Sequence, residues 1–112
     1  MTEKPLGKSG LSIRPFVLGG NVFGFTADRA ASFAILDRYV ELGGGMIDTA
    51  DVYSAWVPGH KGGESESVIG AWLKESGARN SVLIATKVGM MPGGLKPDRI
   101  RDAVQGLSLI HI

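Results

Sequence analysis

Asp48, Tyr53 and Lys87 are the residue types that acid catalysis by a tyrosine requires. An ordinary tyrosine has a pKa of about 10, so it donates a proton at neutral pH only with a nearby cation that stabilises the phenolate. Lys87 could supply that cation, and the carboxylate of Asp48 could hold the lysine in place. The sequence therefore predicts proton donation by Tyr53 with Lys87 as its activator.

Each of these residues also has a simpler structural interpretation. An aspartate after a strand is more often a helix cap or a loop hydrogen bonder, and a loop tyrosine usually covers apolar surface. Lys87 is more informative, because it follows the apolar run 82–85 and a lysine there needs a carboxylate partner. A structural ion pair with Asp48 would meet that need, but the joint arrangement with Tyr53 favours a functional site.

The composition is typical of one globular domain. The chain has 112 residues, of which 44% are hydrophobic and 21% charged, with a net charge of +1 and no cysteine. The scattered Lys and Arg residues argue against a nucleic-acid or anionic-lipid partner. Neither a secretory signal nor a membrane-spanning run is present in this sequence, so we expect no membrane partner and a cytoplasmic location.

Glycines divide the chain into alternating predicted strands and helices. The predicted elements are a small hairpin at 6–13, strands at 16–20, 46–47 and 82–85, and helices at 29–42, 66–74 and 97–105. This order implies parallel strands, whose C-terminal ends share one edge. Asp48, Tyr53 and Lys87 all follow strand ends, so we expect them at that edge together.

Several segments resemble, in order and spacing, the N-terminal part of the aldo-keto reductase family. The resemblance covers residues 4 to about 106, and the loop 54–63 is similar to that of bacterial relatives of the potassium-channel beta subunits. The segments that carry it are Leu6-Gly7-Lys8-Ser9-Gly10-Leu11, Leu18-Gly19-Gly20-Asn21-Val22-Phe23-Gly24, Asp48-Thr49-Ala50-Asp51-Val52-Tyr53, Gly63-Glu64-Ser65-Glu66 and Ala85-Thr86-Lys87-Val88-Gly89.

The resemblance implies an α/β fold, the (β/α)8 TIM barrel, that uses NADPH and no metal to reduce an aldehyde or ketone to an alcohol. By position in the family motifs, Tyr53 would protonate the carbonyl oxygen and Lys87 would activate Tyr53. Asp48 would hold Lys87 and lie near the nicotinamide ribose. The predicted partner is thus a small carbonyl substrate.

The resemblance also places the nicotinamide end of the cofactor against Gly20, Asn21, Val22 and Asp48. Trp56, in the long loop, is a candidate for lining the substrate pocket, because such pockets use aromatic side chains. His60 has no second ligand at metal spacing, and we expect it to be solvated.

The chain is much shorter than the barrel of the family. A closed barrel takes about 250 residues, so residues 1–106 are expected to supply an N-terminal hairpin and about three β/α units. The family's fourth catalytic residue is a histidine after strand four, and His111 is not expected to fill that position, because a loop and a helix occupy the residues after Lys87.

The hypothesis for residues 107–112 is a foreign tail, similar to translated sequencing adapter joined to a truncated reading frame. We expect the chain alone to be an incomplete, inactive fragment.

Two further functions stay open. One is a non-catalytic, cofactor-binding regulatory subunit of the same fold. The other is a lyase in which Lys87 forms a Schiff base, as a desolvated lysine can. Tyr53, five residues after Asp48, favours the reductase, because an aldolase does not need that partner.

Overall fold

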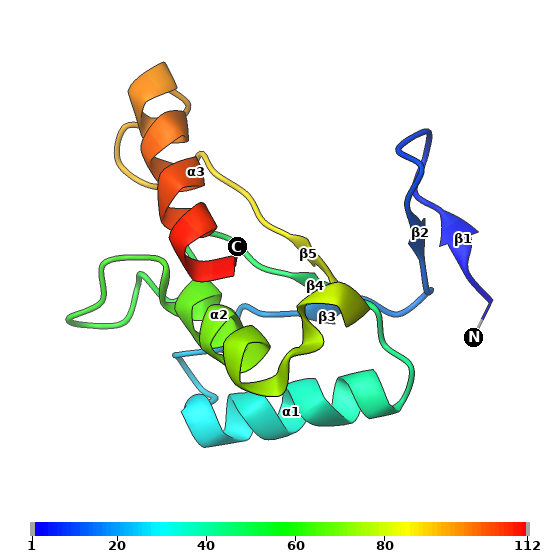
Figure 1. The fold of residues 1–112 in the computed structure, drawn as a ribbon. Coiled ribbons are helices and arrows are strands. Elements are labelled where there is room, and N and C mark those ends of the chain that lie inside the picture. The colour runs from blue at the N-terminus through cyan, green and yellow to red at the C-terminus, as the bar shows by residue number, and fades with distance from the viewer. Residues whose placement is uncertain (1, 112) are drawn as a thin grey trace.

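The computed structural model describes residues 2–111, and it describes side chains only as far as residue 108. Its elements appear in Figure 1 as a hairpin, a small sheet and helices that lie below and to one side of that sheet. In chain order they are β1 (Lys4–Pro5), β2 (Ser12–Ile13), β3 (Leu18–Gly19), α1 (Arg29–Glu41), β4 (Met46–Asp48), α2 (Glu64–Ser76), the 3₁₀ helix η1 (Ala78–Ser81), β5 (Leu83–Ala85) and α3 (Pro97–His111).

The central sheet is parallel, with the strand order β3-β4-β5. Ile47 in β4 pairs with Leu18 on one side and Ile84 on the other, which aligns the three strand ends. β1 and β2 form a separate antiparallel hairpin, which stands at the opposite end of the molecule from α3 (Figure 1). The predicted parallel order is confirmed, and with it the common edge at which the strands end.

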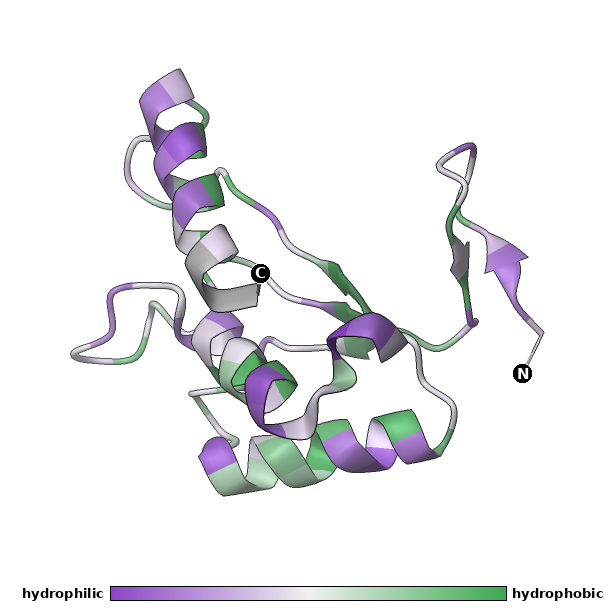
Figure 2. Ribbon diagram, in the orientation of Figure 1, coloured by the Kyte–Doolittle hydropathy of each residue, from purple (hydrophilic) through white to green (hydrophobic). Residues whose placement is uncertain are grey.

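The core lies between the sheet and helices α1 and α2. Leu36, Ile47 and Ile69 are fully buried in it, and Trp72 is 2% exposed. The indole N–H of Trp72 donates to Asp37 Oδ1 at 2.8 Å, which links α2 to α1. Figure 2 shows the apolar strands β4 and β5 above helices whose turns alternate between polar and apolar residues. Trp72 is therefore part of the core that joins the two helices.

Helix α1 matches its predicted span, and its cap explains where it begins. The carboxylate of Asp28 accepts a hydrogen bond from the Ala31 backbone N–H at 2.8 Å, which satisfies one of the free donors of the first turn. Helix α2 begins at Glu64, two residues before its predicted start, and ends before Gly77 in the left-handed conformation (φ 69°).

The predicted end of the third helix near residue 105 is wrong. Helix α3 continues to His111. Gly106 weakens a helix by about 1 kcal/mol relative to alanine, but the glycine that commonly ends a helix does so in a left-handed conformation. Gly106 is not among the residues of positive φ, so the helix passes through it.

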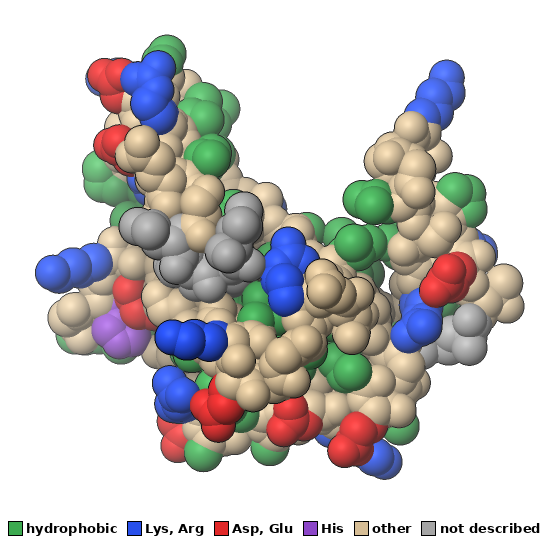
Figure 3. Space-filling view, in the orientation of Figure 1, with side chains coloured by type: hydrophobic (Ala, Val, Ile, Leu, Met, Phe, Trp, Pro, Cys, Tyr) green, Lys and Arg blue, Asp and Glu red, His purple; other side chains and the backbone are tan. Residues whose placement is uncertain are grey.

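The apolar run 82–85 is typical of a strand covered on both faces, but the structure does not cover it so. Leu83, Ile84 and Ala85 of β5 are each only partly buried, because helices cover one face of the sheet (Figure 1). Val17, next to β3, is 38% exposed. Figure 3 shows apolar side chains exposed along α3 and near the hairpin, with charges of both signs interspersed along the lower edge.

None of the helices in the described part of the chain is both long enough and apolar enough to cross a membrane.

Candidate active site

Three of the predicted site residues lie at the C-terminal edge of the parallel sheet. Asp48 is the last residue of β4, Lys87 follows β5 by two residues, and Tyr53 lies in the loop after β4. Because Asp48 pairs with Ala85 across the β4–β5 ladder, the chain that leaves β5 carries Lys87 past the Asp48 side chain. Strand pairing thus brings together residues that lie far apart in the sequence.

The ammonium group of Lys87 is held by oxygen atoms of β4 and its loop. Lys87 Nζ donates to Asp48 Oδ1 at 2.9 Å, to Asp48 Oδ2 at 2.8 Å and to the Thr49 carbonyl at 2.8 Å. The same nitrogen lies 4.9 Å from the centroid of the Tyr53 ring. The predicted grouping of Asp48, Tyr53 and Lys87 is present in the structure, and their catalytic roles stay a prediction.

The surroundings of Lys87 stabilise its charged form. Burial lowers the pKa of Lys87, but the hydrogen bonds and charges of Asp48 and Tyr53 outweigh that effect and raise the pKa above its ordinary value. The Lys87 side chain is half exposed, so water screens part of this interaction. Lys87 is therefore a cation throughout the neutral pH range, as an activator of Tyr53 must be.

Gly20, Asn21 and Val22 lie at the end of β3, beside Asp48. The Gly20 backbone N–H donates to the Asp48 carbonyl at 2.7 Å. A Cβ atom at Gly20 would lie 3.1 Å from both that carbonyl and the Ser65 hydroxyl, so the close approach favours glycine. Asn21 is exposed and Val22 is half-buried. The cofactor contacts expected of these residues stay a prediction.

Trp56 lies against Tyr53, with a second aromatic ring that the sequence prediction missed. The Trp56 and Tyr53 centroids are 6.5 Å apart, and Phe25 meets Trp56 edge-to-face at 5.7 Å. Phe25 and Trp56 are each 52% exposed, so they form an apolar wall open to solvent beside Tyr53. Phe25 lies in an irregular loop, so no periodic sequence pattern predicts its contact with Trp56.

A buried hydroxyl pair joins the ends of two strands to α2, and the sequence prediction missed it too. Ser65 Oγ donates to the Gly20 carbonyl at 2.7 Å and lies 2.8 Å from Thr49 Oγ1. Both hydroxyl side chains are fully buried. Thr49 and Ser65 both belong to segments that resemble the family, and this is the sequence feature from which their role could have been predicted.

Ser54 holds the loop directly after Tyr53. It is a fully buried residue of positive φ (68°), a conformation rarely adopted by residues other than glycine. Its hydroxyl donates to the Phe23 carbonyl at 2.7 Å, and its own carbonyl lies 2.9 Å from His60 Nδ1. The expectation that His60 is solvated is wrong, because this contact and the nearby Glu64 carboxylate pack it into the loop.

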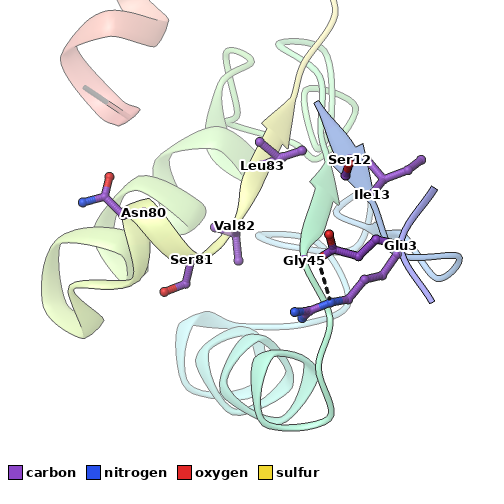
Figure 4. Close-up of a pocket in the computed structure, with 9 residues that line it drawn as sticks. Glu3, Ser12, Ile13, Gly45, Asn80, Ser81, Val82 and Leu83 are labelled. Atoms are coloured by element: carbon purple, nitrogen blue, oxygen red, sulfur yellow. Dashed lines mark ion pairs between the residues drawn. The ribbon is translucent and has the colours of Figure 1, made fainter. Parts of the chain in front are cut away.

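A separate hollow of about 140 Å³ lies at the opposite end of the sheet, between the hairpin and the starts of β4 and β5. Figure 4 shows Ser12, Ile13, Gly45 and Leu83 around it, with the Asn80 side chain pointing away from them. None of the predicted site residues lines this hollow.

The remaining predictions for site residues concern histidine and metal. His111 stands at the end of α3 and not after a strand, and its side chain lies outside the described residues. Among the residues that the structure describes, no group of three or more His, Asp or Glu side chains is placed to hold a metal ion.

Comparison with known proteins identifies the family to which the chain is similar. The family model described as Aldo/keto reductase family matches residues 15–107. An uncharacterized 11.2 kDa protein of Pseudescherichia vulneris is 54% identical over 90 residues, which are 80% of this chain and 87% of that protein. The NADP(+) aryl-alcohol dehydrogenase of Phanerodontia chrysosporium is 34% identical over 90 residues, which are 73% of this chain and 22% of that protein.

A solved structure shares the fold. An aldo-keto reductase from Pseudomonas aeruginosa aligns with a TM-score of 0.71 at 27% identity, over 95% of this chain and 41% of that chain. The chain therefore spans less than half of that structure and about a fifth of the dehydrogenase. Because the family match covers most of the chain and the parallel sheet with its flanking helices agrees with it, this chain belongs to the aldo/keto reductase family.

Proposed function

We propose that this chain carries the N-terminal part of the active site of an NADPH-dependent oxidoreductase that reduces an aldehyde or ketone to an alcohol. The observation that carries the proposal is the placement of Lys87 Nζ, bound to both carboxylate oxygens of Asp48 and 4.9 Å from the Tyr53 ring. A protonated lysine beside a tyrosine favours loss of the phenolic proton, which is the proton that carbonyl reduction requires.

Each residue has one task in the proposed reaction. Tyr53 donates its hydroxyl proton to the carbonyl oxygen while the carbonyl carbon accepts a hydride. The tyrosinate that remains is stabilised by the charge of Lys87, and Asp48 keeps that charge in place. Because Lys87 is already protonated and anchored, little reorganisation is needed when the negative charge forms.

NADPH supplies the hydride when it is bound. The donor set at the sheet edge fits the nicotinamide end of such a cofactor. Asn21 offers an exposed amide, and Asp48 offers a carboxylate whose side chain is 38% exposed and can accept a hydrogen bond from a ribose hydroxyl. The use of NADP(+) by the aryl-alcohol dehydrogenase supports this choice of cofactor.

We further propose that the 112-residue chain alone turns over little or no carbonyl substrate. It supplies three strands of parallel sheet and spans 41% of the aldo-keto reductase structure. The site is open to water on the side that the rest of a barrel would cover, and water weakens each electrostatic contact in it.

The raised pKa of Lys87 weighs against a Schiff-base lyase. Burial alone would lower that pKa, but Asp48 and Tyr53 raise it, so the amine stays protonated at neutral pH. A nucleophilic lysine needs the opposite shift.

A chimera tests the proposal. Residues 15–106 would replace the matching segment of the Pseudomonas aeruginosa aldo-keto reductase, and NADPH oxidation would be followed with a small aldehyde. Tyr53→Phe should abolish reduction while NADPH binding, measured by fluorescence, persists. Lys87→Met should lower turnover severely, whereas Lys74→Met, on the exposed side of α2, should leave it unchanged. Turnover that survives Tyr53→Phe would show that the tyrosine is not the acid.

A further inference from the structure

Glu66 is a buried acid to which the proposed chemistry gives no task. It lies in the first turn of α2 and is 5% exposed. Its carboxylate accepts a hydrogen bond from the Thr86 hydroxyl, with 2.5 Å between the oxygens. Thr86 directly precedes Lys87, so the contact attaches α2 to the segment that carries the lysine.

A second buried acid holds the same segment from the other side. The Asp51 backbone N–H donates to the Lys87 carbonyl at 3.2 Å. The Asp51 carboxylate, whose side chain is 12% exposed, is bound by Arg99 of α3 at 2.7 Å. The segment 86–87 is therefore fixed by a side chain of α2 and by a loop that α3 holds.

Glu66 and Lys87 also line one cavity of about 180 Å³, between the end of β5 and helices α2 and α3. A neighbouring hollow brings further charged side chains to Glu66. The charged groups that face Glu66 across these two spaces are Lys87 after β5, Asp51 and Lys61 of the loop before α2, and Arg99 and Asp102 of α3.

These surroundings make Glu66 sensitive to pH. Burial raises its pKa, the Thr86 hydrogen bond lowers it, the Asp51 charge raises it and the Arg99 charge lowers it, with a net rise above 4.5. A change in the charge of Glu66 therefore alters a hydrogen bond one residue away from Lys87.

We propose that Glu66 is a positioning residue for Lys87, acting through Thr86 to set where the ammonium group stands between Asp48 and Tyr53. This inference deepens the proposed reductase function, and its meaning for catalysis rests on that function. Because the geometry is present in this chain, the placement of Lys87 can be tested without turnover.

The test is a titration of the Lys87 side chain by carbon-13 NMR, in the full 112-residue chain. Glu66→Leu keeps the volume but removes the acceptor of the Thr86 hydroxyl, so the pKa of Lys87 should fall. Glu66→Gln keeps an acceptor oxygen, so that pKa should stay near the wild-type value. In wild type the Lys87 signal should also show an acid-side step as the carboxylates near it ionise. The part of the step that Glu66 contributes lies above pH 4.5, and Glu66→Gln should remove that part.

Glu64→Gln is the matched control, since Glu64 belongs to the same turn of α2 but contacts His60 and the Gly62 N–H. It should keep both the acid-side step and the pKa of Lys87. Thr86→Val removes the same hydrogen bond by deleting its donor, so this variant replaces Glu66→Leu in the test if Glu66→Leu does not fold. The proposal would be overturned by a Lys87 pKa that stays unchanged in every folded variant lacking the hydrogen bond. It would also be overturned by an acid-side step of the same size in Glu66→Gln as in wild type.

Kinetics in the chimera separate this proposal from the proposed function. Thr86→Val should lower kcat roughly 10- to 100-fold with little change in KM, because a small misplacement of a catalytic group has effects of that size. Loss of activity in Tyr53→Phe with unchanged kcat in Thr86→Val would refute the positioning role alone. A chimera that keeps turnover in Tyr53→Phe would refute the reductase mechanism and leave the NMR result standing.

Discussion

At the scale of single residues, Lys87 is the residue on which the site depends. Its three ammonium protons are bound by the Asp48 carboxylate and the Thr49 carbonyl, and its position over the Tyr53 ring follows from those bonds. A carboxylate that holds a lysine both neutralises it and restricts its rotation. The lysine therefore has one well-defined place, which an exposed lysine otherwise lacks.

Asp48→Asn should lower the pKa of Lys87, because burial still opposes the charge while the carboxylate no longer favours it. Carbon-13 NMR of the lysine side chains measures this, with Asp98→Asn at the exposed start of α3 as the control. In wild type the folded pKa lies above the unfolded value of 10.5, so this stabilisation is present below pH 10.5 and is lost as pH rises through the folded pKa. An equal pKa in both variants would contradict the anchoring role of Asp48.

Ser54→Ala should destabilise the fold by about 1–3 kcal/mol, because the Phe23 carbonyl loses its buried hydrogen bond. Urea denaturation followed by circular dichroism measures the change. Ser67→Ala, at an exposed position of α2, is the control and should change stability by less than about 0.5 kcal/mol. Equal stability of the two variants would show that the Ser54 hydroxyl does not support the loop.

At the scale of elements, Tyr39 joins α1 to the start of β4. Its hydroxyl contacts the Phe16 and Met46 carbonyls at 2.6 and 2.7 Å and accepts from the Gly45 and Met46 backbone N–H groups. The turn 43–45 passes so close to the Tyr39 ring that only glycine fits at position 44, the middle residue of the turn. The short turn therefore places β4, and with it Asp48, relative to α1.

Gly44→Ala should destabilise the chain by about 1–3 kcal/mol or more, because its Cβ would lie 2.2 Å from the Tyr39 ring. The adjacent Gly45→Ala is the control, since the nearest atom to its Cβ would be 3.9 Å away. Thermal unfolding of the two variants compares them under identical conditions. Similar melting temperatures would argue against close packing of Tyr39 on this turn.

At the scale of the whole molecule, the sheet is covered by helices on one face only. β3 and β5 are edge strands, and Phe16 and Val17 beside β3 are 61% and 38% exposed. An exposed edge with apolar neighbours is a site of association between chains. We therefore expect the isolated chain to be marginally stable and to associate as its concentration rises.

Val17→Lys should reduce this association, because a charge at a sheet edge opposes pairing with another chain. Analytical ultracentrifugation over a range of concentrations measures it. Leu42→Lys, at the C-cap of α1 and 62% exposed, is the control for added charge alone. A wild-type chain that is monomeric and melts cooperatively would contradict the expectation of an unstable fragment.

Much of the fold could be predicted because its signals are local. Asp28 marks the start of α1, and the apolar spacing within that helix marks its buried side. The parallel order followed from the alternation of strands and helices. The end of α3 was missed, because the helix continues through Gly106, which does not have the positive φ typical of a glycine that ends a helix.

The sequence by itself determined the family, the parallel direction of the strands and the edge at which Asp48, Tyr53 and Lys87 meet, because motif spacing and alternating elements are properties of the chain order. Only the tertiary structure decided that the Thr49 carbonyl also holds Lys87 and that Glu66 binds the neighbouring Thr86. The bonds of Lys87 to Asp48 and Thr49, and of Thr86 to Glu66, join separate elements. Such contacts depend on how separate strands and helices pack against one another, and signals local to one segment do not specify that packing.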